Sequence, residues 1–142
     1  MVDTADSHPV FAWPVRVYWE DTDAGGVVYH AGYLRFLERA RSEWLRQAAM
    51  GQQRLREEFG ILFVVRSLEI DFKLPARLDD LLSVTMRPTA LRGASFIAAQ
   101  EIRREPKDTP LVQARVRIAC LGATTFRPQP IPASLLEEMT SQ

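Results

Sequence analysis

The clearest pattern of hydrophobic positions lies between residues 30 and 50. Apolar side chains recur there at steps of three and four, which places them on one stripe of an α-helix. Charged residues fill much of the remaining circumference, and Gly51 fits the end of such a helix. We therefore predict a long amphipathic helix whose stripe packs on the core. The stripe consists of Tyr33, Phe36, Leu37, Ala40, Trp44, Leu45 and Ala48.

Alternating apolar and polar positions predict strands on both sides of this helix. One strand precedes it, with Val15 and Val17 on one face, and a run of strands follows it. Such an order predicts an α+β fold in which an antiparallel meander packs against the helix. The expected strands are 11–19, 61–74, 81–88 (Pro88 at an edge or bulge), 95–104 and 111–121, with a possible short piece at 124–126. The expected turns are 75–80, 92–93 and 105–110, and the short helices are 52–59, ending at Gly60, and 132–139.

The chain has 142 residues, which suits one domain with one core. We predict a flexible tail over residues 1–10 and a single domain over 11–142. The tail lacks the features of a signal peptide, and no apolar run approaches the ~18 residues of a membrane span, so we expect a cytoplasmic protein. Lys+Arg and Asp+Glu both number 18, so the formal net charge is zero and no overall positive potential favours nucleic acid. A sheet that wraps one helix leaves edges to cover, so dimerisation is expected.

The candidate chemistry lies just before the long helix. Asp21 and Asp23 are followed by a double glycine, Gly25-Gly26, and then by the helix start near His30. A carboxylate held beside a helix N-terminus can act as base or nucleophile, while the free N–H groups of the first turn stabilise an anion. The glycines let the chain turn back, so that the carboxylate and the donor can lie together.

Other interpretations of these residues are weaker. Asp21-x-Asp23-x-x-Gly26 starts like a calcium loop, but Gly32 occupies the twelfth position, where a bidentate Glu is required. We expect Asp21 to hold the loop through hydrogen bonds to its backbone. Cys120 is the only cysteine, which excludes an intrachain disulfide and leaves a Cys-based metal site unsupported. Its apolar strand setting predicts a buried, inert thiol.

Four segments carry a resemblance to a known family. They are residues 21–33 (DTDAGGVVYHAGY), 36–41 (FLERAR), 64–72 (VVRSLEIDF) and 75–80 (PARLDD). Together they resemble the 4-hydroxybenzoyl-CoA thioesterase family, and in particular its branch of bacterial acyl-CoA thioesterases associated with the Tol–Pal system. The resemblance covers roughly residues 13–128.

The resemblance implies a hotdog fold, in which an antiparallel sheet wraps a central helix, and it implies a homodimer or homotetramer. It also implies hydrolysis of acyl-CoA thioesters with no metal and no cofactor. Asp23 aligns with the family's active-site carboxylate, as general base or as nucleophile. His30 aligns with the residue whose backbone N–H polarises the thioester carbonyl, and a role for the His30 side chain stays open.

Substrate contacts are expected from several further residues. Tyr29 and Tyr33 either pack or line the acyl pocket. Arg92 is the first candidate for binding the CoA phosphates, because guanidinium groups pair well with phosphate. Arg66 follows as a weaker candidate, together with Arg77, Arg115 and Arg117.

Three functions are compatible with these features. The first is an acyl-CoA thioesterase acting on short-chain, long-chain or aromatic acyl groups. The second is a hotdog acyl-binding or scaffold protein with weak hydrolysis, which interacts with acyl carrier protein or with envelope machinery. The third is a hotdog dehydratase or hydratase. The sequence favours the first.

Overall fold

The long amphipathic segment forms helix α1, Gly32–Ala48. Every residue of the predicted apolar stripe is buried, and Phe36 and Leu37 are 0% and 1% exposed. Burying an apolar side chain of this size contributes about 1.5–3 kcal/mol to stability. The stripe packs on one face of the sheet, so α1 organises the core, as the periodicity predicts.

The computed structural model describes residues 10–140, so the predicted tail lies outside the described residues apart from Val10. The predicted order of a strand, a long helix and an antiparallel meander is confirmed. The elements are β1 Phe11–Arg16, the 3-10 helix η2 Trp19–Asp21, α1 Gly32–Ala48, α2 Gln52–Phe59, β2 Ile61–Phe72, β3 Leu81–Arg92, β4 Ser95–Arg104, β5 Thr109–Gly122 and α3 Ala133–Thr140.

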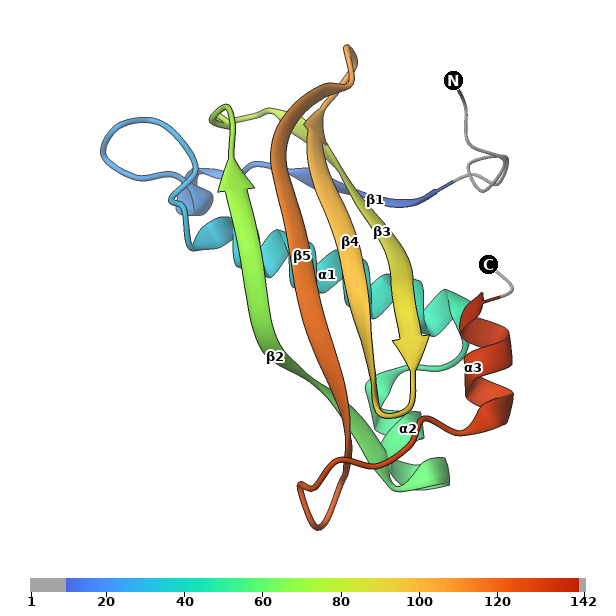
Figure 1. The fold of residues 1–142 in the computed structure, drawn as a ribbon. Helices are drawn as coiled ribbons and strands as arrows, with labels where there is room; N and C mark the ends of the chain where they lie inside the picture. Colours follow the sequence, from blue (N-terminus) through green and yellow to red (C-terminus); the bar gives the residue numbers. More distant parts are fainter. Residues whose placement is uncertain (1–9, 141–142) are drawn as a thin grey trace.

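The strands form a five-stranded sheet in the order β1-β3-β4-β5-β2, and every neighbouring pair is antiparallel. Helix α1 crosses one face of this sheet, and α2 and α3 lie towards the end of the sheet where β3 finishes (Figure 1). The side chains of β5 alternate between the two faces, as a period of two requires. Val112, Ala114 and Val116 are buried on the α1 side, whereas Arg115 and Arg117 are exposed.

The ends of several predicted elements differ from the structure. β1 ends at Arg16 because the Tyr18 N–H donates to the Asp21 carboxylate at 2.8 Å and the chain turns into η2. Gly51 does not end the long helix, whose C-cap is Ala49. It is instead the N-cap of α2, and Gly60 ends α2 in the left-handed conformation with φ 64°, as predicted.

β3 runs through Pro88 to Arg92, beyond its predicted end at residue 88. Its neighbour β1 pairs only as far as Met86, so on that side the ladder stops before the proline, which has no N–H to donate. On the other side Pro88 remains in register with Ala98 of β4. The short strand predicted at residues 124–126 is wrong, because that segment is a turn.

β2 is an edge strand with apolar side chains that α1 does not cover. Leu68 and Phe72 lie opposite Val116 and Val112, which are buried against the core. Leu68 is nevertheless 39% exposed and Phe72 46% exposed. The core face of the sheet therefore extends beyond its own helix along β2.

Cys120 is buried in β5, and burial raises the pKa of its thiol to about 11. Because the thiolate is the reactive form, a thiol with that pKa is ionised in only about one molecule in a thousand at pH 8. We expect the folded protein to react with a thiol-specific dye at least ~100-fold more slowly than a small-molecule thiol at pH 8. Absorbance after mixing measures this rate. In guanidinium chloride the full equivalent should react, and rapid labelling of the native protein would contradict the burial.

Candidate active site

The loop before α1 closes as a tight hairpin. Thr22 pairs with Val28, and the Asp23 N–H donates to the Val27 carbonyl at 2.9 Å. The Gly26 N–H donates to the Asp23 carbonyl at 3.0 Å, with Gly26 at φ 81°, a conformation that glycine adopts without steric cost. The double glycine therefore turns the chain back, as predicted.

The Asp23 carboxylate lies on the outside of this hairpin. Its side chain is exposed, and Oδ1 accepts a hydrogen bond from the Gly25 N–H at 2.8 Å. A Cβ at position 25 would come within 3.2 Å of that oxygen, so glycine leaves the space that the carboxylate occupies. Asp23 therefore presents one oxygen fixed by the loop and a surface open to a ligand.

The start of α1 leaves two backbone donors free. Its N-cap, Ala31, makes no side-chain capping bond. The Gly32, Tyr33 and Leu34 N–H groups donate to carbonyls three residues earlier. Within residues 10–140, the N–H groups of His30 and Ala31 have no acceptor. Unpaired N–H groups at a helix N-terminus attract an anion through their partial positive charge.

Aromatic rings surround this helix start. The His30 ring is tilted against the Tyr29 ring, with 4.5 Å between the ring centroids. It meets the Phe72 ring edge-on, with 6.4 Å between the centroids. His30 and Tyr29 are both exposed, so both can reach a ligand. Phe72, at the end of β2, was not singled out in the sequence, since alternation alone does not place a strand end beside a helix start.

Tyr33 packs in the core. It is 3% exposed, its ring contacts Phe36 and Phe72, and its hydroxyl accepts a hydrogen bond from the Ala76 N–H at 3.0 Å. Burial raises the pKa of Tyr33, and the negative charge of Asp23 adds to that rise. Of the two roles left open for Tyr33, the structure supports packing.

Asp21 has the structural role expected for it. It is 7% exposed, and its Oδ2 accepts the Tyr18 N–H at 2.8 Å. Its own carbonyl accepts the Tyr29 N–H at 3.1 Å, which ties η2 to the segment that enters α1. Asp21 thus joins the two ends of the loop, whereas the Asp23 carboxylate, within residues 10–140, accepts only the hydrogen bond from Gly25.

The arginines are distributed unevenly around this site. β3 starts beside the end of β1 and runs to Arg92, so Arg92 lies at the other end of the sheet, roughly 35 Å along the strand. Arg66 is exposed at a bulge in the middle of β2. Arg77 pairs with Val27 of the loop itself, so of the predicted arginines it lies nearest to Asp23 in the chain's own fold. The phosphate contacts predicted for Arg92 and Arg66 stay predictions.

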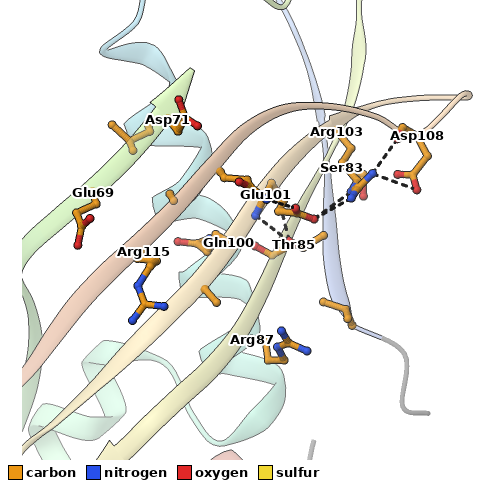
Figure 2. Close-up of a pocket in the computed structure, with 15 residues that line it drawn as sticks. Glu69, Asp71, Ser83, Thr85, Arg87, Gln100, Glu101, Arg103, Asp108 and Arg115 are labelled. Carbon is orange, nitrogen blue, oxygen red and sulfur yellow. Dashed lines mark hydrogen bonds and ion pairs between the residues drawn. The ribbon is translucent and has the colours of Figure 1, made fainter. Parts of the chain in front are cut away.

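A wide groove of about 750 Å³ lies elsewhere, on the sheet face opposite α1. Figure 2 shows its charged side chains, several of which are bonded to one another. Arg103 forms ion pairs with Glu101 at 3.0 Å and with Asp108 at 3.5 Å, and Gln113 donates to Glu101 at 3.0 Å. These pairings lower the pKa of Glu101 against the opposing effect of its burial. The groove contains neither Asp23 nor His30.

Comparison with known proteins shows the family of this chain. Residues 17–139 match the model of the thioesterase-like superfamily. The chain belongs to that superfamily. The acyl-CoA thioester hydrolase YbgC of Escherichia coli O6:H1 is 45% identical over 129 residues, which are 91% of this chain and 95% of the relative. The acyl-CoA thioesterase YbgC of Haemophilus influenzae is 47% identical, over 86% of this chain and 88% of the relative.

Solved structures extend the likeness to three dimensions. A probable thioesterase from Bartonella henselae is 40% identical, with a TM-score of 0.81 over 87% of this chain and 99% of that one. The hotdog fold implied by the motif is therefore confirmed, and so is the resemblance to the thioesterase family. Within residues 10–140, no helix has the length and apolar character needed to cross a bilayer.

The two aspartates should differ in their effect on stability. Asp21→Ala removes a buried side chain and leaves the part-buried Tyr18 N–H without its acceptor, so we expect the free energy of unfolding to fall by about 1–3 kcal/mol. Asp23→Ala removes an exposed carboxylate and should change it by less than about 1 kcal/mol. Urea unfolding followed by tryptophan fluorescence measures both. Equal losses in the two variants would contradict the division of roles.

Proposed function

We propose that this thioesterase-superfamily chain hydrolyses acyl-CoA thioesters, with Asp23 as the catalytic carboxylate. The observation that supports the proposal is the pair of unpaired N–H groups of His30 and Ala31 at the start of α1, next to the exposed Asp23 loop. The relatives named acyl-CoA thioesterases, at 45% and 47% identity, supply the substrate class.

Each group has a defined role in the proposed reaction. The thioester carbonyl oxygen accepts a hydrogen bond from the His30 N–H, and the positive end of the α1 dipole stabilises the negative charge that develops on it. One such donor contributes on the order of 3 kcal/mol in the transition state. Asp23 either takes a proton from the attacking water or attacks the carbonyl itself to form a mixed anhydride that water then hydrolyses. In both routes the C–S bond breaks and CoA leaves as the thiol.

The uncovered edge of β2 supports a homodimer. A long edge strand that exposes Leu68 and Phe72 on its core face is covered most simply by a second copy of the same strand. In an antiparallel pair the sum of the two residue numbers is constant along the ladder. With the two-fold axis at Leu68, the core faces of the two strands lie on the same side of the joined sheet, and Phe72 lies opposite residues 63–65 of the partner strand. The site of one protomer then faces the middle of β2 of the other.

Other features of the assignment rest on the sequence alone. A cytoplasmic location, an interaction with acyl carrier protein and an association with the Tol–Pal machinery stay predictions. A homotetramer built from the β2 dimer is likewise a prediction.

Asp23→Asn should lower kcat/KM for a hydrolysed acyl-CoA by ~100-fold or more, because the amide is neither a base nor a comparable nucleophile. The assay is free-thiol release from short-chain, long-chain and aromatic acyl-CoAs. Asp79→Asn is the matched control, since Asp79 is an exposed loop residue at φ 70° and asparagine adopts that conformation readily. Full activity of Asp23→Asn would overturn the role of Asp23. No hydrolysis by the wild type would favour the acyl-binding alternative.

Leu68→Arg places an unpaired charge in the proposed β2 interface, where its burial is costly. We therefore expect this variant to be a monomer in sedimentation velocity and to hydrolyse the substrate ~10-fold or more slowly. Glu69→Arg is the control, because Glu69 lies on the same strand with its side chain on the opposite face. A wild-type monomer with full activity would contradict the interface.

A further inference from the structure

A small cavity of about 170 Å³ lies between α1 and the sheet, at the β2 edge. Its floor is apolar and aromatic, formed by Trp44, Phe63, Val65, Met86, Phe96 and Ile118. Phe96 contacts both Trp44 and Phe63, at centroid distances of 6.1 and 5.5 Å. An engineered apolar cavity of about 150 Å³ is known to hold benzene. The cavity therefore suits one ring or a chain of about six carbons.

One wall of this cavity carries a cation held by a buried amide. Gln100 is 2% exposed, and its Nε2 donates to the Leu37 carbonyl at 3.0 Å and to the Thr85 carbonyl at 3.2 Å. Its Oε1 accepts a hydrogen bond from Arg41 Nη1 at 3.1 Å. Because both groups of the amide are engaged, Gln100 fixes the position of the Arg41 guanidinium against the cavity.

Arg41 has more donors than the protein uses. A guanidinium carries five N–H groups, and one bond, to Gln100, is formed. Within residues 10–140, no carboxylate lies within ion-pair distance of Arg41. Burial lowers the pKa of Arg41, and the charge of Glu38, which also lines the cavity, opposes this without forming an ion pair. The cavity thus combines an apolar floor with a partly desolvated cation that lacks a bound anion.

The position of the cavity depends on the dimer proposed above. Arg41 lies eleven residues after His30 along the chain, about 16 Å along the helix, so the cavity is far from Asp23 of its own chain. In the β2 pairing, however, residues 63–65, which line the cavity, lie opposite Phe72 of the partner subunit. Phe72 contacts His30 within each chain. The cavity of one protomer therefore adjoins the Asp23 site of the other.

We propose that this cavity receives the acyl group and that Arg41 selects acyl groups of about six carbons, or one aromatic ring, that end in a carboxylate. The inference rests on the proposed thioesterase function and names its substrate class. The apolar floor binds the carbon skeleton, and the guanidinium of Arg41 pairs with the terminal carboxylate. Acyl chains well beyond this length do not fit the volume.

Hydrolysis of two matched substrates tests the selection. Hexanoyl-CoA and adipoyl-CoA have the same chain length and differ by a terminal carboxylate. We expect the wild type to prefer adipoyl-CoA in kcat/KM by at least ~10-fold, and Arg41→Met to lose this preference with less than a ~3-fold change for hexanoyl-CoA. Arg46→Met removes an exposed charge from the same helix and should keep the preference. Palmitoyl-CoA should be a poor substrate for all three proteins.

Specific outcomes overturn the inference. Equal wild-type kcat/KM for the two substrates overturns the role of Arg41 and leaves the thioesterase function intact. Equal losses for both substrates in a folded Arg41→Met, checked by its melting temperature, show that Arg41 is structural. Arg41→Lys, which retains the charge, should restore a part of the preference.

A binding measurement tests recognition by Arg41 independently of hydrolysis. Calorimetry with the otherwise unaltered Asp23→Asn protein should give a Kd for adipoyl-CoA at least ~10-fold lower than for hexanoyl-CoA, and Arg41→Met in that background should equalise the two. If the wild type hydrolyses neither substrate but this difference is present, the thioesterase proposal fails and the recognition by Arg41 stands. If the two bind equally, the recognition fails whatever the hydrolysis shows.

Discussion

The burial of one face of α1 against the sheet is the interaction on which the rest of the structure depends. The sheet is formed by strands that are distant along the chain, and β1 and β2 reach its two edges from opposite sides of the helix segment. The apolar stripe gives these strands a common surface to pack on, because it presents Phe36, Leu37 and Ala40 without interruption along the helix. Without that surface, an antiparallel meander would expose one whole apolar face to water.

The same packing also creates the candidate active site. Once α1 is held on the sheet, its first turn is fixed beside the loop that carries Asp23. Tyr33 anchors this turn through its hydrogen bond from the Ala76 N–H, and Asp21 ties the loop entrance to Tyr29. A helix end with an acidic side-chain cap would have satisfied its own donors. Here the N-cap is Ala31, which makes no side-chain capping bond, and within residues 10–140 the N–H groups of His30 and Ala31 at this helix start have no acceptor.

The β2 edge and the cavity beside it extend this arrangement beyond one chain. The helix is narrower than the sheet, so the core face continues past it along β2, where Leu68 and Phe72 are partly exposed. Farther along the same strand, Val65 and Phe63 line the cavity that holds Arg41. A surface that one chain leaves open can therefore serve both for association and for substrate recognition. The buried amide of Gln100 bonds α1 to the sheet and also holds the guanidinium of Arg41 at the cavity.

The sequence by itself determined the α+β class, the extent of α1 to within two residues at each end, the shared face of Val15 and Val17 and the position of the Asp23 loop before the helix. These features are local, because the periodicity, the glycine conformations and the motif each depend on residues that are close together in the sequence. It did not determine the end of β1, the course of β3 past Pro88 or the role of Gly51, since each depends on a neighbouring segment. Only the tertiary structure decided that Tyr33 is core, that Arg92 lies far from Asp23, and that Gln100 holds Arg41 at a cavity. Those facts depend on contacts between distant residues, such as Gln100 and Leu37, which are 63 positions apart and which no local pattern brings together.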